Sequence, residues 1–195
     1  MAFTVSEFKS NVSKAGGGAR PALYKIAFTA RTTSFSLSAN ESLLVKTAAI
    51  PPSTLAPLTV NYAGRAYKWT GLRTFDNWTT TVLNDESFSI RNKITQWMRD
   101  LSGQMDGLRD GQRGDPTLTG STGYDDATAT VTQLGTDGAA KQIYKFYNLW
   151  PTELAEIAVD WSSDMIQEYT VTWCYDYWSS GAGTNTSNIV SSKAS

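Results

Sequence analysis

Three pairs of neighbouring carboxylates are the residues of this sequence best suited to acid–base chemistry: Asp85 with Glu86, Asp125 with Asp126, and Glu153 with Glu156. Two carboxyl groups that flank a glycosidic bond can hydrolyse it without any histidine. Each pair also has a simpler explanation, because acidic residues stabilise helix N-termini and are common in solvated turns. We therefore expect no catalytic residues among them.

The sequence contains no histidine and one cysteine, Cys174. The lack of histidine removes the Ser-His-Asp and Cys-His nucleophile systems, His-ligated zinc and the usual general base near pH 7. A single cysteine can form neither an internal disulfide nor a two-cysteine metal site. Cys174 is predicted to lie within a strand, where a buried or interface thiol is more common than a nucleophile. We expect a protein that is not an enzyme and has no cofactor.

Two glycine-rich segments are candidates for ion or phosphate sites. Gly16-Gly17-Gly18 is not followed by the Lys-Ser/Thr pair of a phosphate-binding loop. Residues 102–124 contain six of the fifteen glycines, together with Asp106, Asp110 and Asp115. These aspartates lack the alternating spacing of a calcium loop, so no metal site is expected. The segment is interpreted as a loop insertion.

The seven tryptophans all lie between residues 69 and 178. Exposed aromatic rings can bind sugars as flat platforms, so a glycan-binding β-sandwich module is kept as an alternative function. Trp78, Trp97 and Trp173 nevertheless fall on the apolar faces of expected strands or helices. That placement favours a role in the core.

Short extended segments dominate the pattern along the chain. Strands are predicted at 23–28, 34–37, 43–48, 58–62, 66–69, 77–83, 127–134, 142–149, 157–161 and 166–177. One helix is predicted after Asn84-Asp85, ending at Ser102-Gly103. Its core face would be Ile90, Ile94, Trp97, Met98 and Leu101. The result is a mainly β domain, a two-sheet sandwich or partial barrel with one packed helix.

Residues 21–178 are expected to form a single domain between a flexible arm (1–20) and a mobile Ser/Thr/Gly-rich tail (179–195). Alternation within 166–177 places Tyr169, Val171, Trp173, Tyr175 and Tyr177 on one face. The opposite face would carry Glu168, Thr170, Thr172, Cys174 and Asp176. The N-terminus lacks the apolar region of a signal peptide, and no apolar run is long enough to span a bilayer.

The net charge of −1 hides an uneven distribution. Residues 1–74 carry nine basic and two acidic side chains, a net +7, and residues 75–195 carry a net −8. The basic residues are spread singly and form no phosphate-binding cluster. One interpretation is a domain whose surfaces simply differ in sign. The other is complementary surfaces on copies of one protein, which would meet head to tail and build rings or filaments.

Three stretches resemble the tail tube proteins of contractile-tailed, T4-like bacteriophages. They are Gly71 to Glu86 (Gly-Leu-Arg-Thr-Phe-Asp-Asn-Trp and on to Asn-Asp-Glu), Asn148 to Thr152 followed by Val159-Asp160-Trp161, and Glu168 to Trp178. The resemblance covers about Arg20 to Trp178. The segment 102–124 and the tail beyond Trp178 look larger than the family pattern.

The resemblance implies a structural virion protein. Family members form six-membered rings whose subunits contribute strands to one inner β-barrel, and the rings stack into a tube for DNA ejection. The implied partners are other copies of the chain, the contractile sheath, the baseplate, the tape-measure protein and double-stranded DNA that passes without sequence-specific binding. The implied location is the virion tail, after assembly in the host bacterial cytoplasm. The inner tube of a phage-derived injection system is the alternative.

Two surfaces are assigned roles on this basis. A DNA conduit should avoid basic walls, because phosphate contacts would retard the polymer. Glu168, Thr170, Thr172 and Asp176 are therefore predicted to line the lumen or a subunit contact. The basic stretch 46–68 is predicted to project as a loop in ring stacking, where Lys46, Arg65 and Lys68 would meet acidic groups on the next ring.

Overall fold

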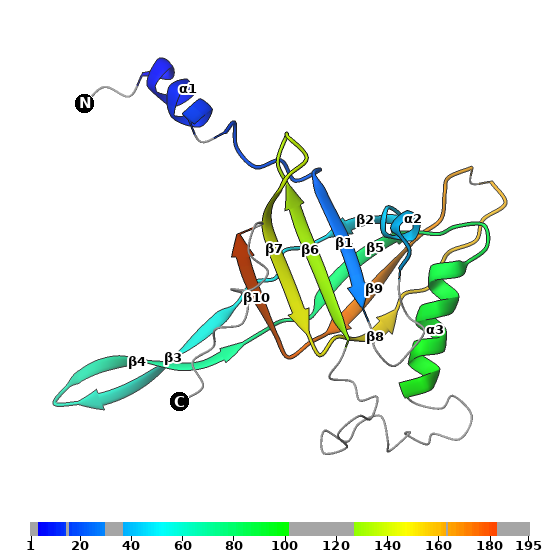
Figure 1. Ribbon diagram of the computed structural model, residues 1–195. Helices are drawn as coiled ribbons and strands as arrows, with labels where there is room; N and C mark the ends of the chain where they lie inside the picture. The colour runs from blue at the N-terminus through cyan, green and yellow to red at the C-terminus, as the bar shows by residue number, and fades with distance from the viewer. Residues whose placement is uncertain (1–3, 15, 30–36, 102–126, 163, 183–195) are drawn as a thin grey trace.

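The computed structural model describes residues 4–14, 16–29, 37–101, 127–162 and 164–182. This part of the chain contains ten strands and three helices (Figure 1). Eight strands form two four-stranded sheets, and the other two form a separate hairpin. The mainly β class predicted from the sequence is confirmed. The two sheets stay open and do not close into a barrel within the described chain.

Both large sheets are antiparallel throughout. Sheet 1 has the order β1-β6-β7-β10, with strands Tyr24–Thr29, Thr128–Leu134, Ala140–Tyr147 and Tyr177–Ala182. Sheet 2 has the order β2-β5-β9-β8, with strands Val45–Ala48, Trp78–Leu83, Glu168–Cys174 and Trp150–Leu154. The separate hairpin consists of β3 (Thr54–Tyr62) and β4 (Arg65–Thr74), inserted between β2 and β5.

The core lies between the two sheets and is rich in aromatic rings. Trp78 stacks on Phe146 of sheet 1 at 4.4 Å between ring centroids, and Trp173 lies 5.1 Å from Phe28. The Trp173 indole N–H donates to the buried Thr80 hydroxyl at 2.9 Å, so its polar atom is satisfied. The prediction that these tryptophans belong to the core is confirmed.

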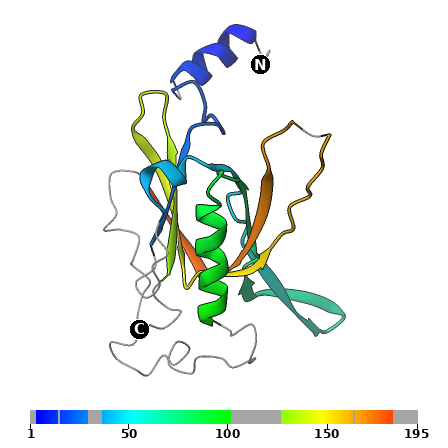
Figure 2. The same cartoon turned by 90° about the vertical axis from the view of Figure 1, so that its right-hand side faces the viewer.

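Helix α3 (Ser89–Leu101) covers one open side between the sheets (Figure 2). The Asp85 carboxylate accepts a hydrogen bond from the Ser89 backbone N–H at 3.0 Å, close to the start of the helix. The predicted core face is confirmed: Ile90, Ile94 and Trp97 are buried, and Met98 and Leu101 pack against the core. Burial opposes ionisation of Asp85, but hydrogen bonds from Ser87 and Ser89 hold its pKa below the usual value.

Two helices occur where the sequence interpretation placed none. Helix α1 (Val5–Lys14) occupies much of the expected flexible arm, and helix α2 (Ala39–Ser42) precedes β2. Both begin with reciprocal side-chain capping, between Thr4 and Glu7 in α1 and between Ser38 and Glu41 in α2. This Ser/Thr-x-x-Glu pattern is a helix-start signal, readable in the sequence at both positions.

Two strand predictions were wrong. Residues 157–161 form no strand, and the long strand predicted at 166–177 is two strands in different sheets. The chain leaves sheet 2 after Cys174 and enters sheet 1 at Tyr177. Asp176 is held at this turn, because its N–H donates to the Tyr147 carbonyl and Asn148 donates to its carboxylate. Residues 179–182 thus belong to β10 rather than to a mobile tail.

Several other predictions fall on residues outside those described. These are residues 34–36 of the predicted strand 34–37, the loop insertion 102–124, the Asp125–Asp126 pair and the tail from residue 183 onwards.

Candidate assembly surfaces

The outward face of sheet 2 is lined with threonines. Opposite side chains in adjacent strands share this face, and the register gives two rows: Thr47, Thr81 and Thr170, and then Thr79, Thr172 and Glu153. Glu168 lies on the same face at the end of β9, beside Leu83. The surface therefore presents hydroxyl groups with few charges. We call it the threonine face.

The structure brings together three of the four predicted lumen residues. Glu168, Thr170 and Thr172 lie on the threonine face, with Thr170 and Thr172 partly exposed and Glu168 exposed. Asp176 is also exposed but lies in the β9–β10 turn, away from this row. Cys174 is partly exposed on the same strand face. The alternation in β9 was predicted correctly, and only its continuation past Cys174 was wrong.

One of the predicted stacking residues is paired within the chain. The Lys46 ammonium contacts the Glu168 carboxylate, with both side chains substantially exposed. Lys46 lies on β2, whereas Arg65 and Lys68 lie on the separate hairpin β3–β4. The ion pair neutralises Glu168 and leaves Glu153 as the excess charge among the described side chains of this face. The threonine face is therefore weakly acidic.

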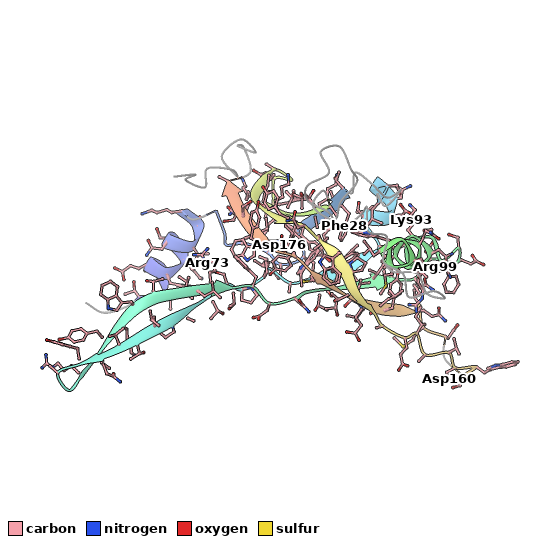
Figure 3. The ribbon with its side chains drawn as sticks, turned by 90° about the horizontal axis from the view of Figure 1, so that it is seen from below. Phe28, Arg73, Lys93, Arg99, Asp160 and Asp176 are labelled. Atoms are coloured by element: carbon pink, nitrogen blue, oxygen red, sulfur yellow. The ribbon has the colours of Figure 1, made fainter. Side chains whose placement is uncertain are left out.

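The hairpin β3–β4 extends away from the sandwich (Figure 3). Its turn residues Ala63 and Gly64 both have positive φ, at 50° and 76°, as expected for a tight two-residue hairpin turn. One face is apolar and exposed, with fractional exposures between 48% and 73% for Leu58, Val60, Tyr62, Tyr67 and Trp69. The other face carries Thr59, Asn61, Lys68 and Thr70. An isolated two-stranded ribbon is only marginally stable in water, and this apolar face stays largely exposed in the described part of the chain.

The root of the hairpin is attached to the sandwich by tryptophans. Trp78 of β5 donates its indole N–H to the Ala49 carbonyl at 2.7 Å, just before the hairpin. Trp178 of β10 donates to the Pro52 carbonyl at 3.5 Å. The hairpin therefore leaves the core from a fixed base. The expected projection between residues 46 and 68 is present, as a regular hairpin rather than an irregular loop.

A second projection lies between β8 and β9, at the opposite end of the molecule, where Figure 3 labels Asp160. We call residues 155–162 and 164–167 the acidic segment. Its root is fixed, because Arg91 of α3 donates to the Ala155 carbonyl at 3.0 Å and the Ala155 N–H donates to Thr170. Its exposed apolar side chains are Val159, Trp161, Met165 and Ile166. Hydrogen bonds from the Ser162 N–H and hydroxyl lower the pKa of Asp160.

The carboxylates proposed above as acid–base candidates lie on different elements of the described chain. Asp85 binds the start of α3, while Glu153 lies on β8 and Glu156 on the acidic segment. In the described ranges, no three acidic or cysteine residues gather where they could hold a metal ion. The same ranges contain no helix with the length and apolarity needed to cross a membrane.

Comparison with known proteins shows the family to which the chain belongs. The sequence model for phage tail tube proteins matches residues 6–180, which include sheet 2, the hairpin, the acidic segment and all of sheet 1 except the last two residues of β10. The chain belongs to the phage tail tube protein family. Its role is therefore structural, in the tail of the virion, as the sequence resemblance indicated.

Similar proteins include the tail tube protein gp19 of Enterobacteria phage T4 and that of phage T6. Each is 32% identical over 178 residues, covering 88% of this chain and 99% of the relative. The fold is similar to a chain of the anti-feeding prophage baseplate, with TM-score 0.61, 9% identity and coverage of 86% and 98%. It is also similar to a chain of the sheath-tube complex of an extracellular contractile injection system, with TM-score 0.56, 11% identity and coverage of 93% and 99%.

Proposed function

We propose that this tail tube protein forms stacked hexameric rings that conduct double-stranded DNA inside a contractile sheath, and that it catalyses no reaction. The observation that carries the proposal is sheet 2. Among the described strands, its edge strands β2 and β8 each have one neighbour, and its outward face is polar and weakly acidic. Pairing of these edges between copies would satisfy their backbone groups and close a barrel.

The threonine face is the proposed lumen wall. Hydroxyl groups and a slight excess of negative charge would let a phosphate backbone pass without holding it, whereas lysines or arginines would bind it and release counterions. Within the face, Glu168 removes the positive charge of Lys46. Thr170 and Thr172 form the middle of the wall, and Asp176 is assigned to a subunit contact at its end.

The further partners follow from the tube role. The hairpin, with Arg65 and Lys68, is proposed to contact the next ring. The contractile sheath would enclose the tube, the baseplate would start it and the tape-measure protein would occupy it before the DNA passes. Similar folds come from a baseplate and from a sheath-tube complex of contractile systems. Assembly would take place in the cytoplasm of the host bacterium.

Electron microscopy of the purified protein tests the proposal directly. Negatively stained samples are expected to show six-membered rings or hollow tubes, because association buries both the free edges and the apolar hairpin face. Sedimentation of a stable monomer at every concentration examined would overturn it.

A gold label tests which face lines the lumen. Thr79 is exposed on the threonine face, so the Thr79→Cys variant in a Cys174→Ser background should carry maleimide-linked gold along the tube axis. The matched control is Lys25→Cys in the same background, on the exposed face of β1 in sheet 1, which should label the outside. Gold from Thr79→Cys on the outer surface would contradict the lumen assignment.

A further inference from the structure

The two projections of the molecule have opposite charge and the same apolar character. Residues 54–74, which form the hairpin, carry Arg65, Lys68 and Arg73 and no acidic residue. The sequence of the acidic segment carries Glu156, Asp160 and Asp164 and no basic residue. The hairpin thus carries three positive charges and the acidic segment three negative charges.

Both projections also expose large apolar side chains. The hairpin presents the row that contains Leu58, Tyr67 and Trp69, and the acidic segment presents Val159, Trp161, Met165 and Ile166. Trp161 is fully exposed. Contiguous apolar patches with charged neighbours mark interaction sites, because burying the apolar area drives association and the charges select the partner.

The two projections cannot cover each other within one copy. They leave opposite ends of the sandwich, the hairpin at the lower left and the acidic segment at the upper right of Figure 1, and Figure 3 shows the same separation from below. Each root is fixed, by the indole bonds of Trp78 and Trp178 on one side and by Arg91 on the other. Any contact between them must therefore join two copies.

We propose that the hairpin of one copy docks on the acidic segment of a copy in the adjacent ring. The proposal rests on the tube role proposed above and names the receptor for the hairpin. Trp69 and its apolar row pack against Trp161, Met165 and Ile166. Arg65 shares this face of the hairpin, opposite Tyr62, and lies near Glu156 and Asp164, while Lys68 adds positive charge from the other face. The contact is head to tail, because the hairpin and the acidic segment lie at diagonally opposite ends of each copy. Each repeat of the contact therefore displaces the next copy and extends a filament.

Charge reversal on each side is the test. The hairpin variant Arg65→Glu/Lys68→Glu and the segment variant Glu156→Lys/Asp164→Lys should each raise the protein concentration needed for tubes by about tenfold or more, because like charges then face each other. Asp160 is left unchanged, so that its bonds to Ser162 still hold the segment. All four substituted side chains are exposed, so the melting temperature of each variant should match that of the parent.

Restoration is the decisive result. The chain with all four reversals has the parent net charge and a complementary pair of opposite polarity, so it should form tubes at nearly the parent concentration. The two single-side variants, neither of which should form tubes at the parent concentration, should also form tubes when mixed, because each supplies the charge that the other lacks. The matched control is Arg20→Glu/Lys25→Glu, two exposed basic residues outside both projections, which should leave tubes intact.

The outcomes separate this proposal from the tube role itself. If either single-side variant forms tubes as readily as the parent, or if the four-fold variant does not recover, the docking proposal is wrong while the tube role stands. Loss of tubes in the Arg20→Glu/Lys25→Glu control would show an effect of net charge and would also overturn the docking proposal. Failure of the parent to form rings or tubes would instead contradict the proposed function.

Discussion

The sandwich and the hairpin use the same kinds of residue in the same alternating pattern, with opposite results. Trp173 on β9 is 1% exposed, whereas Trp69 on β4 is 68% exposed. Each ring alternates with polar neighbours along a strand, so the local signal is the same. The difference is that the Trp173 ring packs against Phe28 of the other sheet, whereas the apolar side of β4 stays exposed in the described chain. The sandwich is completed by folding, and we infer that the hairpin is completed by assembly.

The largest expected effect comes from exchanging the two tryptophans for alanine. Trp173→Ala removes a ring packed against Phe28, Trp78 and Trp97 and leaves Thr80 without its donor, at a cost of about 3–5 kcal/mol in the free energy of unfolding. Trp69→Ala should change that free energy by only about 0.5 kcal/mol or less while strongly weakening tube formation. Urea unfolding and sedimentation of the same preparations measure both quantities.

Equal destabilisation by the two substitutions would contradict the contrast between sandwich and hairpin, because the hairpin would then be part of the cooperatively folded core. A conservative control is Trp69→Phe, which retains an aromatic ring on the apolar face. It should preserve much more tube formation than Trp69→Ala.

A smaller effect is expected where α2 and α3 are joined at the edge of the sandwich. The Glu41 carboxylate receives hydrogen bonds from the Lys93 ammonium, at 2.6 and 2.8 Å, and from the Ser38 N–H. Burial opposes ionisation, but these bonds lower the pKa of Glu41 from 4.5 to about 2. Since the folded pKa is depressed, the stabilisation is complete above about pH 4.5 and is lost as the pH falls toward 2.

Glu41→Gln should therefore lower the free energy of unfolding by about 1–2 kcal/mol at pH 7, with the difference from the parent shrinking as the pH falls toward 2. Denaturant titrations at several pH values measure this dependence. Tube formation at pH 7 should remain, because Glu41 lies on neither projection. A difference that stays constant down to pH 2 would show that the Lys93 pair does not govern the stability of this edge.

The sandwich could be predicted from the sequence because its signals are local. Spacings of three and four placed Ile90, Ile94 and Trp97 on one helix face, and alternation placed Tyr169, Val171 and Trp173 inside. The break between β9 and β10 could not be predicted in this way, because Tyr175 to Tyr177 continue the same alternation. The turn depends on contacts of Asp176 with Tyr147 and Asn148, which are distant in the sequence.

The surfaces were harder to predict for the same reason. The alternation of Leu58, Val60 and Tyr62 indicates a strand with one apolar face, but it carries no information about whether that face is covered. The basic residues of the hairpin are evident in the sequence, whereas the exposure of its apolar row and of the apolar side chains of the acidic segment is not. In contrast, α1 and α2 carried a readable signal in their Ser/Thr-x-x-Glu starts.

The smallest expected effect concerns the ion pair between Lys46 and Glu168 on the threonine face. Both groups are solvated, so Lys46→Met should change the free energy of unfolding by less than about 1 kcal/mol. The same substitution exposes the full charge of Glu168 and makes the proposed lumen wall more acidic.

Glu168→Gln has the opposite result, because it leaves the charge of Lys46 unneutralised on that wall. Binding of short DNA to assembled tubes in low salt should therefore increase for Glu168→Gln and not for Lys46→Met, since only an unpaired lysine attracts phosphate. Equal DNA binding by the two variants would show that DNA does not pass along this face. The threonine face would then have no role as a DNA-facing wall, and it would differ from the hairpin only in its polar side chains.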